Sequence, residues 1–248
     1  MLIFIGLGLW DIKDISLRGL EVAKRAEKVY VEFYTSLFFS SVDEISKILG
    51  KEVEVLKRSD LEENCRVILE EAKNKDVAIL VPGDPMVATT HTALRVEAKK
   101  IGVESKIIHS SSIISAICGI TGLQSYKFGK SATVSWTKSR APVDVIFANR
   151  SINAHTLLLL DLHPAMKISD AIEKLQEVDE NLSKMYAVGV ARVGYDNLVL
   201  CNKMEELKKY DFGSPPHCLV VLSPKLHVVE CEYLRIFANA PDEIERFV

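Results

Sequence analysis

The 248-residue chain lacks any apolar run long enough to cross a membrane. Its apolar opening, MLIFIGLGLW, is shorter than the ~20 residues that a membrane span needs. It has no basic segment before it and continues into the charged residues DIKD, so it does not read as a secretory signal either. We therefore expect a buried first strand here, in a cytoplasmic protein without a membrane partner.

Cysteine and net charge are also low. The five cysteines are odd in number and form no CxxC pair, which favours reduced thiols over disulfides. The 31 basic and 34 acidic residues nearly cancel, leaving a formal charge of -3. Because nucleic-acid binding depends largely on neutralising phosphates, this charge gives no global attraction to nucleic acid. We expect no nucleic-acid partner.

Signatures of common nucleotide and metal sites are absent. GLGLWD begins as GxG, but Asp11 stands where the dinucleotide fingerprint requires its third glycine, and no GK[ST] occurs. The chain has no GxSxG, no HExxH and no zinc-like spacing of Cys and His. The sequence thus supports neither NAD nor a P-loop nucleotide, and it predicts neither an activated nucleophile nor a tight metal site.

What is present indicates an α/β fold. With 48% hydrophobic residues the chain can bury a substantial core, as one large domain or two domains. Short apolar runs alternate with segments of helical period. The first half predicts strands at residues 2–5, 29–33, 53–56, 77–81 and 105–109.

Two helices are predicted between these strands. Residues 59–75 open with Ser59 and Glu62 at capping-box spacing and carry apolar residues on one face. Residues 90–102 offer threonine N-caps and end at Gly102. Beyond the uncharged segment SSSIISAICGITGL, the pattern changes to spaced strands in SATVSW, TLLLLDL, YAVGVARV, NLVLC and CLVVL. We therefore expect an N-terminal α/β domain at residues 1–110 and a C-terminal α/β domain at residues 111–248.

Several predicted strands end in loops rich in glycine, proline and small residues: GLGL, VPGDP, HSSSI, LDLHP, ARVGYDN and SPPH. Such loops at the carboxyl ends of strands are where open α/β sheets bind ligands. Asp84 stands alone in its loop, with no second acid, lysine or metal ligand beside it. It can be a turn or N-cap carboxylate, and His217 a satisfied loop histidine, so the individual loops leave a structural role open.

The combination of motifs is more specific. GLGLWDIKDIS, PGDPMVATTH and YKFGKSATV, with further matches from residue 1 to about residue 238, resemble the diphthine synthases, a family of the tetrapyrrole methylase superfamily. The resemblance implies two α/β domains of tetrapyrrole methylase type with the cofactor cleft between them. It also implies a homodimer that uses S-adenosyl-L-methionine to methylate the amino group of the modified histidine of translation elongation factor 2.

The resemblance also implies a set of cofactor-binding residues, with no catalytic side chain and no metal: Leu9, Asp84, Val87, Ser112, Ile113, Leu160, Val193 and His217. The family often has proline where this chain has Ser111 and a smaller alanine at Val193. Compared with the family, the chain is shorter after Trp136 and around residues 163–180. The shortened segments concern loops that face the protein substrate, whereas the differences at Ser111 and Val193 fall in cofactor-binding loops.

The chemistry accounts for the missing catalytic groups. Methyl transfer from a sulfonium is a direct displacement, so the protein has to align an amine with the methyl carbon and exclude water. An α-amino group has a reference pKa of about 7.7 to 8.0, so a workable fraction is neutral at cytoplasmic pH, and the chemistry does not demand a base that the sequence would have to reveal. Three alternatives stay open at this point: an RNA ribose methyltransferase, a precorrin methyltransferase and a non-catalytic module that binds a protein.

Overall fold

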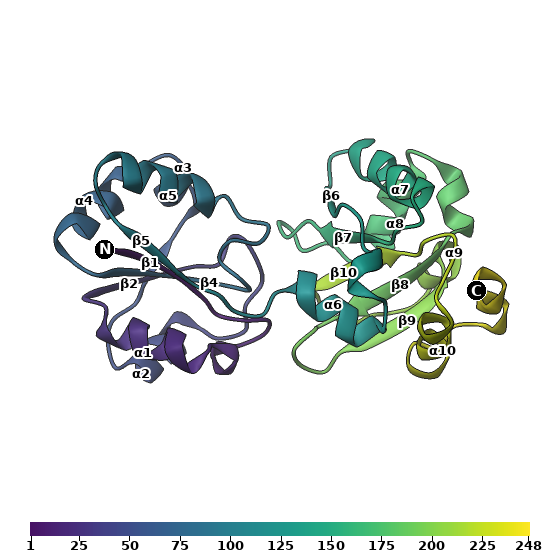
Figure 1. Cartoon of the computed structure of the whole chain (residues 1–248), viewed down its shortest axis with the longest axis horizontal. Helices are drawn as coiled ribbons and strands as arrows, with labels where there is room; N and C mark the ends of the chain where they lie inside the picture. The colour runs from purple at the N-terminus through teal and green to yellow at the C-terminus, as the bar shows by residue number, and fades with distance from the viewer. The chain divides into compact units, whose positions relative to one another are not determined.

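The computed structural model describes residues 1–248 and divides the chain into two compact units, Met1–Ile113 and Ile114–Val248. We call them unit 1 and unit 2. Each unit contains one five-stranded sheet with helices packed against it (Figure 1). The α/β class predicted from the sequence is confirmed. None of the helices combines the length and the apolar composition that crossing a membrane requires.

The sheet of unit 1 is entirely parallel, in the order β3-β2-β4-β1-β5. Its central strands are apolar throughout because helices cover both faces, which is typical of parallel sheets. All five predicted strands are found, within a residue or two of their predicted ends. Their bounds are β1 Leu2–Gly6, β2 Lys28–Glu32, β3 Glu54–Leu56, β4 Val77–Val81 and β5 Ser105–Ile108.

The helices of unit 1 form two layers, one on each face of the sheet (Figure 1). α1 Leu17–Arg25 and α2 Val42–Leu49 lie on one face, and α3 Arg58–Glu62, α4 Arg66–Asn74 and α5 His91–Lys100 lie on the other. A short 3₁₀-helix, η1 Ile12–Asp14, follows the first loop. Each layer encloses its own apolar cluster against the sheet. The two layers leave the loops at the carboxyl ends of the strands uncovered by regular structure.

The single helix predicted at residues 59–75 is wrong, because the structure has two helices there. The capping interaction begins two residues earlier than predicted: the backbone N–H of Lys57 donates to Asp60 Oδ2 over 2.7 Å. The N–H groups of Glu63 and Asn64 both donate to the carbonyl of Ser59, which ends α3. Asparagine is a poor residue for a helix interior, and the chain restarts as α4.

The second predicted helix is correct in position but not in its cap. Thr90 precedes α5, yet its hydroxyl donates to Glu62 Oε1 over 2.8 Å and does not cap the helix. Gly102 follows the helix with φ of +79°, a conformation that glycine adopts without strain. The predicted C-terminal stop is therefore confirmed.

Unit 2 has a mixed sheet in the order β6-β7-β10-β8-β9. β6 runs parallel to β7, whereas β10 is antiparallel to both of its neighbours, β7 and β8, and β9 is antiparallel to β8. All five segments predicted as strands form strands. Their bounds are β6 Ala132–Val134, β7 Thr156–Leu160, β8 Tyr186–Ala191, β9 Leu198–Lys203 and β10 His217–Val221.

More helices belong to the second half of the chain than the sequence indicated. The α-helices are α6 Ile113–Thr121, α7 Ala141–Ser151, α8 Ile168–Gln176, α9 Met204–Leu207 and α10 Val228–Phe237. The 3₁₀-helices are η2 Ser125–Lys127, η3 Glu180–Lys184 and η4 Asp242–Phe247. Side chains of α7, α8 and α9 form one apolar cluster with the sheet, and α6 and α10 lie on its other side (Figure 1).

Candidate ligand-binding loops

Five of the predicted site residues follow three neighbouring strands of unit 1. Leu9 comes after β1, Asp84 and Val87 after β4, and Ser112 and Ile113 after β5. These strands are adjacent and parallel, so the loops start from the same edge of the sheet. The first two loops are joined directly, since Gly8 and Gly83 exchange backbone hydrogen bonds. The structure thus brings the three predicted loops of unit 1 together.

Close backbone packing at this edge requires glycine at position 6. A Cβ at Gly6 would lie 2.6 Å from the carbonyl oxygen of Gly83 and 2.6 Å from the Cβ of Ser110. Both distances are shorter than real Cβ atoms tolerate, so a larger residue would force the three loops apart. Gly6, the last residue of β1, therefore sets how closely the loops after β4 and β5 approach each other.

Asp84 connects two of these loops through its buried carboxylate. Oδ1 accepts from the N–H of Met86 over 2.9 Å, within the same loop. Oδ2 accepts from the N–H of Ser110 over 3.2 Å and lies 2.8 Å from Nδ1 of His109. The side chain of Asp84 is thus used within the protein, where it fixes the loop after β4 against the loop after β5. The sequence did not assign a role to His109.

A second acid–imidazole pair lies at the same edge and was missed by the sequence analysis. Glu32, the last residue of β2, accepts from the N–H groups of Tyr34 and Thr35 over 2.9 and 3.0 Å. Its Oε1 lies 3.4 Å from Nε2 of His91, and both side chains are buried. Spacing along the sequence gave no signal, because residues 32 and 91 meet only when β2 pairs with β4.

The other three predicted residues meet at one edge of the sheet of unit 2. β10 pairs with β7 and β8 on its two sides, and His217 is the register partner of Ala191. Leu160 is the last residue of β7, directly beyond Leu159, which pairs with the residue after His217. Val193 follows β8 by two residues. Leu160, Val193 and His217 therefore lie on three adjacent strands or their extensions.

His217 is a buried, neutral histidine with one unused acceptor. Its Nε2 lies 3.1 Å from the carbonyl oxygen of Ser214, which can only accept, so Nε2 carries the hydrogen. Burial lowers the pKa of the ring to about 4, although the carbonyl of Ser214 acts in the opposite direction. Nδ1 has no hydrogen-bond partner. An unsatisfied buried acceptor is costly, so this atom is suited to a ligand that donates a hydrogen bond.

Arg192 holds the loop before His217 and was also missed. Its Nη1 donates to the carbonyl oxygens of Phe212 and Ser214 over 2.5 and 3.0 Å, and its backbone N–H donates to Pro216. Arg192 has a positive φ of 53°, which is uncommon for a residue with a side chain. The Gly in ARVGYDN signalled a turn, but no sequence feature identified the arginine as its support.

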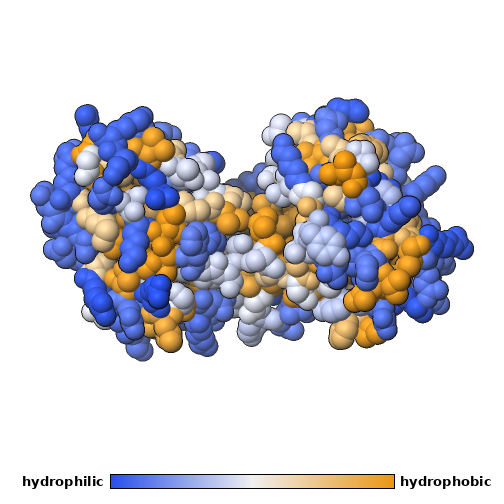
Figure 2. All heavy atoms as spheres, in the orientation of Figure 1, coloured by the Kyte–Doolittle hydropathy of each residue, from blue (hydrophilic) through white to orange (hydrophobic).

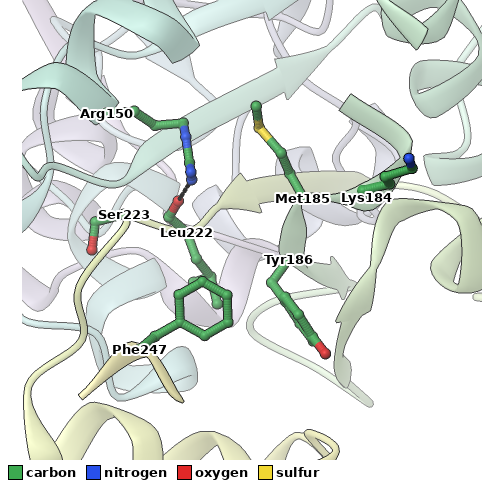
Figure 3. A pocket seen from close by; sticks show the side chains of 7 residues that line it. All are labelled: Arg150, Lys184, Met185, Tyr186, Leu222, Ser223 and Phe247. Carbon is green, nitrogen blue, oxygen red and sulfur yellow. Dashed lines mark hydrogen bonds between the residues drawn. The ribbon is translucent and has the colours of Figure 1, made fainter. Parts of the chain in front are cut away.

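A separate pocket in unit 2 lies at the opposite end of the same strands (Figure 3). It is lined by Arg150, Lys184, Met185, Tyr186, Leu222, Ser223 and Phe247. Arg150 donates from Nη1 to the carbonyl of Leu222 over 2.8 Å, and Figure 3 shows the charged end of Lys184 and the hydroxyl of Tyr186 directed away from that contact. Its polar groups do not point toward a common centre, so we do not propose a binding site in this pocket.

Comparison with known proteins identifies the family of the chain. The chain belongs to the family of Tetrapyrrole (Corrin/Porphyrin) Methylases, which it matches over residues 1–208. It is therefore an S-adenosylmethionine-dependent methyltransferase.

Its full-length relatives are more specific. The chain is 57% identical to a diphthine synthase of Archaeoglobus fulgidus, with 100% of both chains covered. It is 44% identical to a diphthine synthase of Methanosarcina mazei, with 98% of each chain covered. A crystal structure of diphthine synthase superposes with a TM-score of 0.98 at 57% identity and covers 100% of this chain and 99% of that chain.

The described residues fit S-adenosylmethionine, which carries hydrogen-bond donors on its adenine, ribose and amino groups. His217 offers a buried acceptor without a partner. A Cβ at Gly83 would meet nothing within 4 Å, so the loop after β4 borders open space. Exposed backbone of this kind permits close approach of a ligand.

Proposed function

We propose that this protein is a diphthine synthase, which methylates the amino group of the modified histidine of translation elongation factor 2 during diphthamide biosynthesis. The observation that carries this proposal is the match to a diphthine synthase crystal structure, at 57% identity and a TM-score of 0.98 over the whole chain. Both ends of the chain and both sheets take part in that match, so it is not a likeness of one common domain.

We propose that the cofactor contacts eight residues: Leu9, Asp84, Val87, Ser112, Ile113, Leu160, Val193 and His217. In unit 1 the contacts are backbone groups of the three adjacent loops, since the carboxylate of Asp84 is already used by the protein. In unit 2, Nδ1 of His217 accepts from a cofactor donor. When bound, the cofactor supplies a methyl group on a sulfonium. The protein orients the two reactants and excludes water.

We further propose that the protein acts in the cytoplasm as a homodimer. On α10 four large apolar side chains are at least half exposed: Val228, Val229, Ile236 and Phe237. They lie on one side of the helix, opposite the buried Cys231 and Leu234, and Figure 2 shows apolar surface over this region. An apolar helix face of this kind pairs well with its own copy about a two-fold axis. Light scattering of the parent and of Phe237→Glu tests this assignment.

The decisive experiment is the intact mass of elongation factor 2 after incubation with the protein and S-adenosylmethionine. The factor that carries the aminocarboxypropyl-histidine should gain successive single methyl groups, because each methylated amine can lose a proton until three methyl groups are attached. The unmodified factor lacks this amine and should not react. Transfer of labelled methyl to bulk RNA and not to the modified factor would overturn the proposal.

Cofactor binding and salt dependence together test the alternatives that the sequence left open. S-adenosylmethionine and S-adenosylhomocysteine should raise the unfolding temperature, whereas NAD and ATP should not. A ligand at about 100 times its Kd stabilises a protein by about 2.7 kcal/mol, which a thermal shift detects readily. A non-catalytic protein-binding module would give no shift. An RNA ribose methyltransferase would instead lose activity steeply as the salt concentration rises.

A further inference from the structure

We propose that His109 is the base that removes the proton from the substrate's amino group, with Asp84 as its positioning partner. This inference rests on the proposed function and deepens it. It assigns a catalytic residue where the sequence indicated none. It is carried by the geometry of the hydrogen bond between His109 and Asp84.

The hydrogen bond to Asp84 fixes which nitrogen of His109 carries the hydrogen. An ionised carboxylate can only accept, and Oδ2 lies 2.8 Å from Nδ1, so Nδ1 donates. In the neutral ring the lone pair is then on Nε2. Asp84 is held in turn by the N–H groups of Met86 and Ser110. The orientation of the imidazole is therefore set by a buried, three-times-bonded carboxylate, as in base–carboxylate pairs of hydrolases.

The accepting nitrogen of His109 is also accessible. Its side chain is 69% exposed, whereas the carboxylate that holds it is only 8% exposed. The structure gives Nε2 no partner, so this atom is free to accept a proton. The three histidines that are buried do not share this combination: His91, His155 and His217.

His109 stands at the place where the cofactor is proposed to bind. It is the first residue after β5, and it precedes Ser112 and Ile113 in the same loop. Its partner belongs to the neighbouring loop, which contains Val87. A base is useful only within reach of the reacting amine, and this position borders the residues proposed to hold the methyl donor.

The proposed step balances as follows. The substrate ammonium transfers one proton to Nε2 of His109 and becomes a neutral amine. The lone pair of that amine forms the new N–C bond, the C–S bond of the sulfonium breaks, and its electron pair stays on sulfur. His109 releases the proton to water through its exposed side. The product is again an ammonium, so the same step serves each further methylation.

Two substitutions separate a base from a structural side chain. His109→Asn keeps an N–H that can reach Asp84 but has no basic nitrogen, and His109→Ala removes both. We expect both variants to lose up to about tenfold in kcat at pH 7, because only about a tenth of an α-amine with a pKa of about 8 is neutral there without a base. The Kd for S-adenosylhomocysteine should stay within about threefold of the parent's in His109→Asn, because that variant can keep the Asp84 bond. The matched control is Lys106→Ala on the exposed side of β5, which should keep the parent's rate.

Three further readouts test the inference, and two of them, the rescue by imidazole and the pH dependence, do not follow from a structural role. Added imidazole should restore part of the rate of His109→Ala. In the neutral ring of His109, nitrogen chemical shifts of ¹⁵N-histidine should place the hydrogen on Nδ1, with that preference lost in Asp84→Asn. The loss of rate should also shrink as the pH rises above about 8, where an α-amino group deprotonates by itself.

The outcomes distinguish this inference from the proposed function. If the parent protein does not methylate the modified factor, the proposed function fails. If the parent is active and His109→Asn retains its kcat, His109 is not the base and its contact with Asp84 is structural. Equal loss at every pH, without rescue by imidazole, would overturn the inference as well.

Discussion

The pair His109–Asp84 in unit 1 and the pair His155–Glu230 in unit 2 differ in how their polar atoms are used. In unit 1, His109 is largely exposed and bonds to Asp84 through one nitrogen. In unit 2, His155 is fully buried: its Nδ1 accepts from the N–H of Ser223 over 3.0 Å and its Nε2 lies 3.2 Å from Glu230. A histidine bonded to a carboxylate thus occurs once with a free ring nitrogen and once with none.

The difference separates a structural pair from a pair available for chemistry. Glu230 also accepts from the N–H groups of Gln124 and His227, both over 2.8 Å, and from Nζ of Lys127 over 2.6 Å. It therefore connects the start of α10 with the segment after α6 and with the residue before β7. Every strong hydrogen-bonding atom of that network has a partner, so the network can stabilise unit 2 but has no site left for a substrate.

The largest expected effect on stability comes from removing the charge of Glu230, which contacts both His155 and Lys127. Glu230→Gln should lower the free energy of unfolding by about 3 kcal/mol, because it removes one partner of a buried ion pair and leaves Lys127 without its counter-charge. Urea unfolding measures this loss. The Kd for S-adenosylhomocysteine should not change under conditions where the variant is folded. An equal loss in Glu232→Gln, an exposed glutamate on the same helix, would contradict the assignment.

The stability that Glu230 contributes depends on pH over a defined range. Burial alone would raise the pKa of Glu230, but the bonds from His155, Lys127 and two backbone N–H groups lower it from 4.5 to about 2. A carboxylate whose pKa is lower in the folded state contributes stability above its unfolded pKa and loses it as the pH falls. The difference between the parent and Glu230→Gln should therefore be full above about pH 5 and shrink between pH 4.5 and 2.

Asp84 should give an intermediate effect in unit 1. Asp84→Ala removes the acceptor of three hydrogen bonds, two of them from backbone N–H groups. Bonds to charged groups contribute about 1.5 to 3 kcal/mol each, but once the side chain is removed water can reach part of the donors it leaves, the exposed His109 first of all, so the net loss is smaller than the sum. We expect a loss of about 2 kcal/mol in stability and weaker binding of S-adenosylhomocysteine by calorimetry. Unchanged stability and unchanged binding would show that the loops do not depend on the carboxylate.

The sequence predicted the strands of both units because their signal is local. Runs such as VAIL and TLLLL are apolar over the length of a buried strand, and glycine and proline mark their ends. It did not predict the break at Glu63 and Asn64, where a capping interaction two residues earlier competes with Ser59. Periodicity continues across that break, so only the observed bonds reveal it.

The contacts within the candidate site depend on the order of the strands in the sheet, which the hydrophobic periodicity of the sequence does not reveal. Asp84 and His109 are 25 residues apart and meet because β4 and β5 flank β1. The family resemblance selected residues for cofactor binding, and their contacts with the cofactor stay a prediction. It did not show that the carboxylate of Asp84 is bonded to its neighbouring loop, or that Arg192 fixes the turn before His217.

His217 shares one feature with each of the two paired histidines, and its substitution should have the smallest effect of the three. Its ring is buried like that of His155, yet only Nε2 has a partner, as only Nδ1 does in His109. Removing one neutral hydrogen bond to a ligand costs about 1 kcal/mol, so His217→Ala should weaken S-adenosylhomocysteine binding by about fivefold.

The pH dependence distinguishes that bond from a charge interaction. The pKa of His217 is lowered to about 4 in the folded protein, mainly by burial, so the ring contributes stability above its unfolded pKa of 6.5 and loses it as the pH falls towards 4. Between pH 6 and 8 the ring stays neutral in the folded state, and Nδ1 stays an acceptor. Calorimetry should therefore give the same ratio of parent to variant Kd at pH 6 and at pH 8. A ratio that grows as the pH falls through 6.5 would mean that the protonated ring binds the ligand, and that His217 titrates like an exposed histidine.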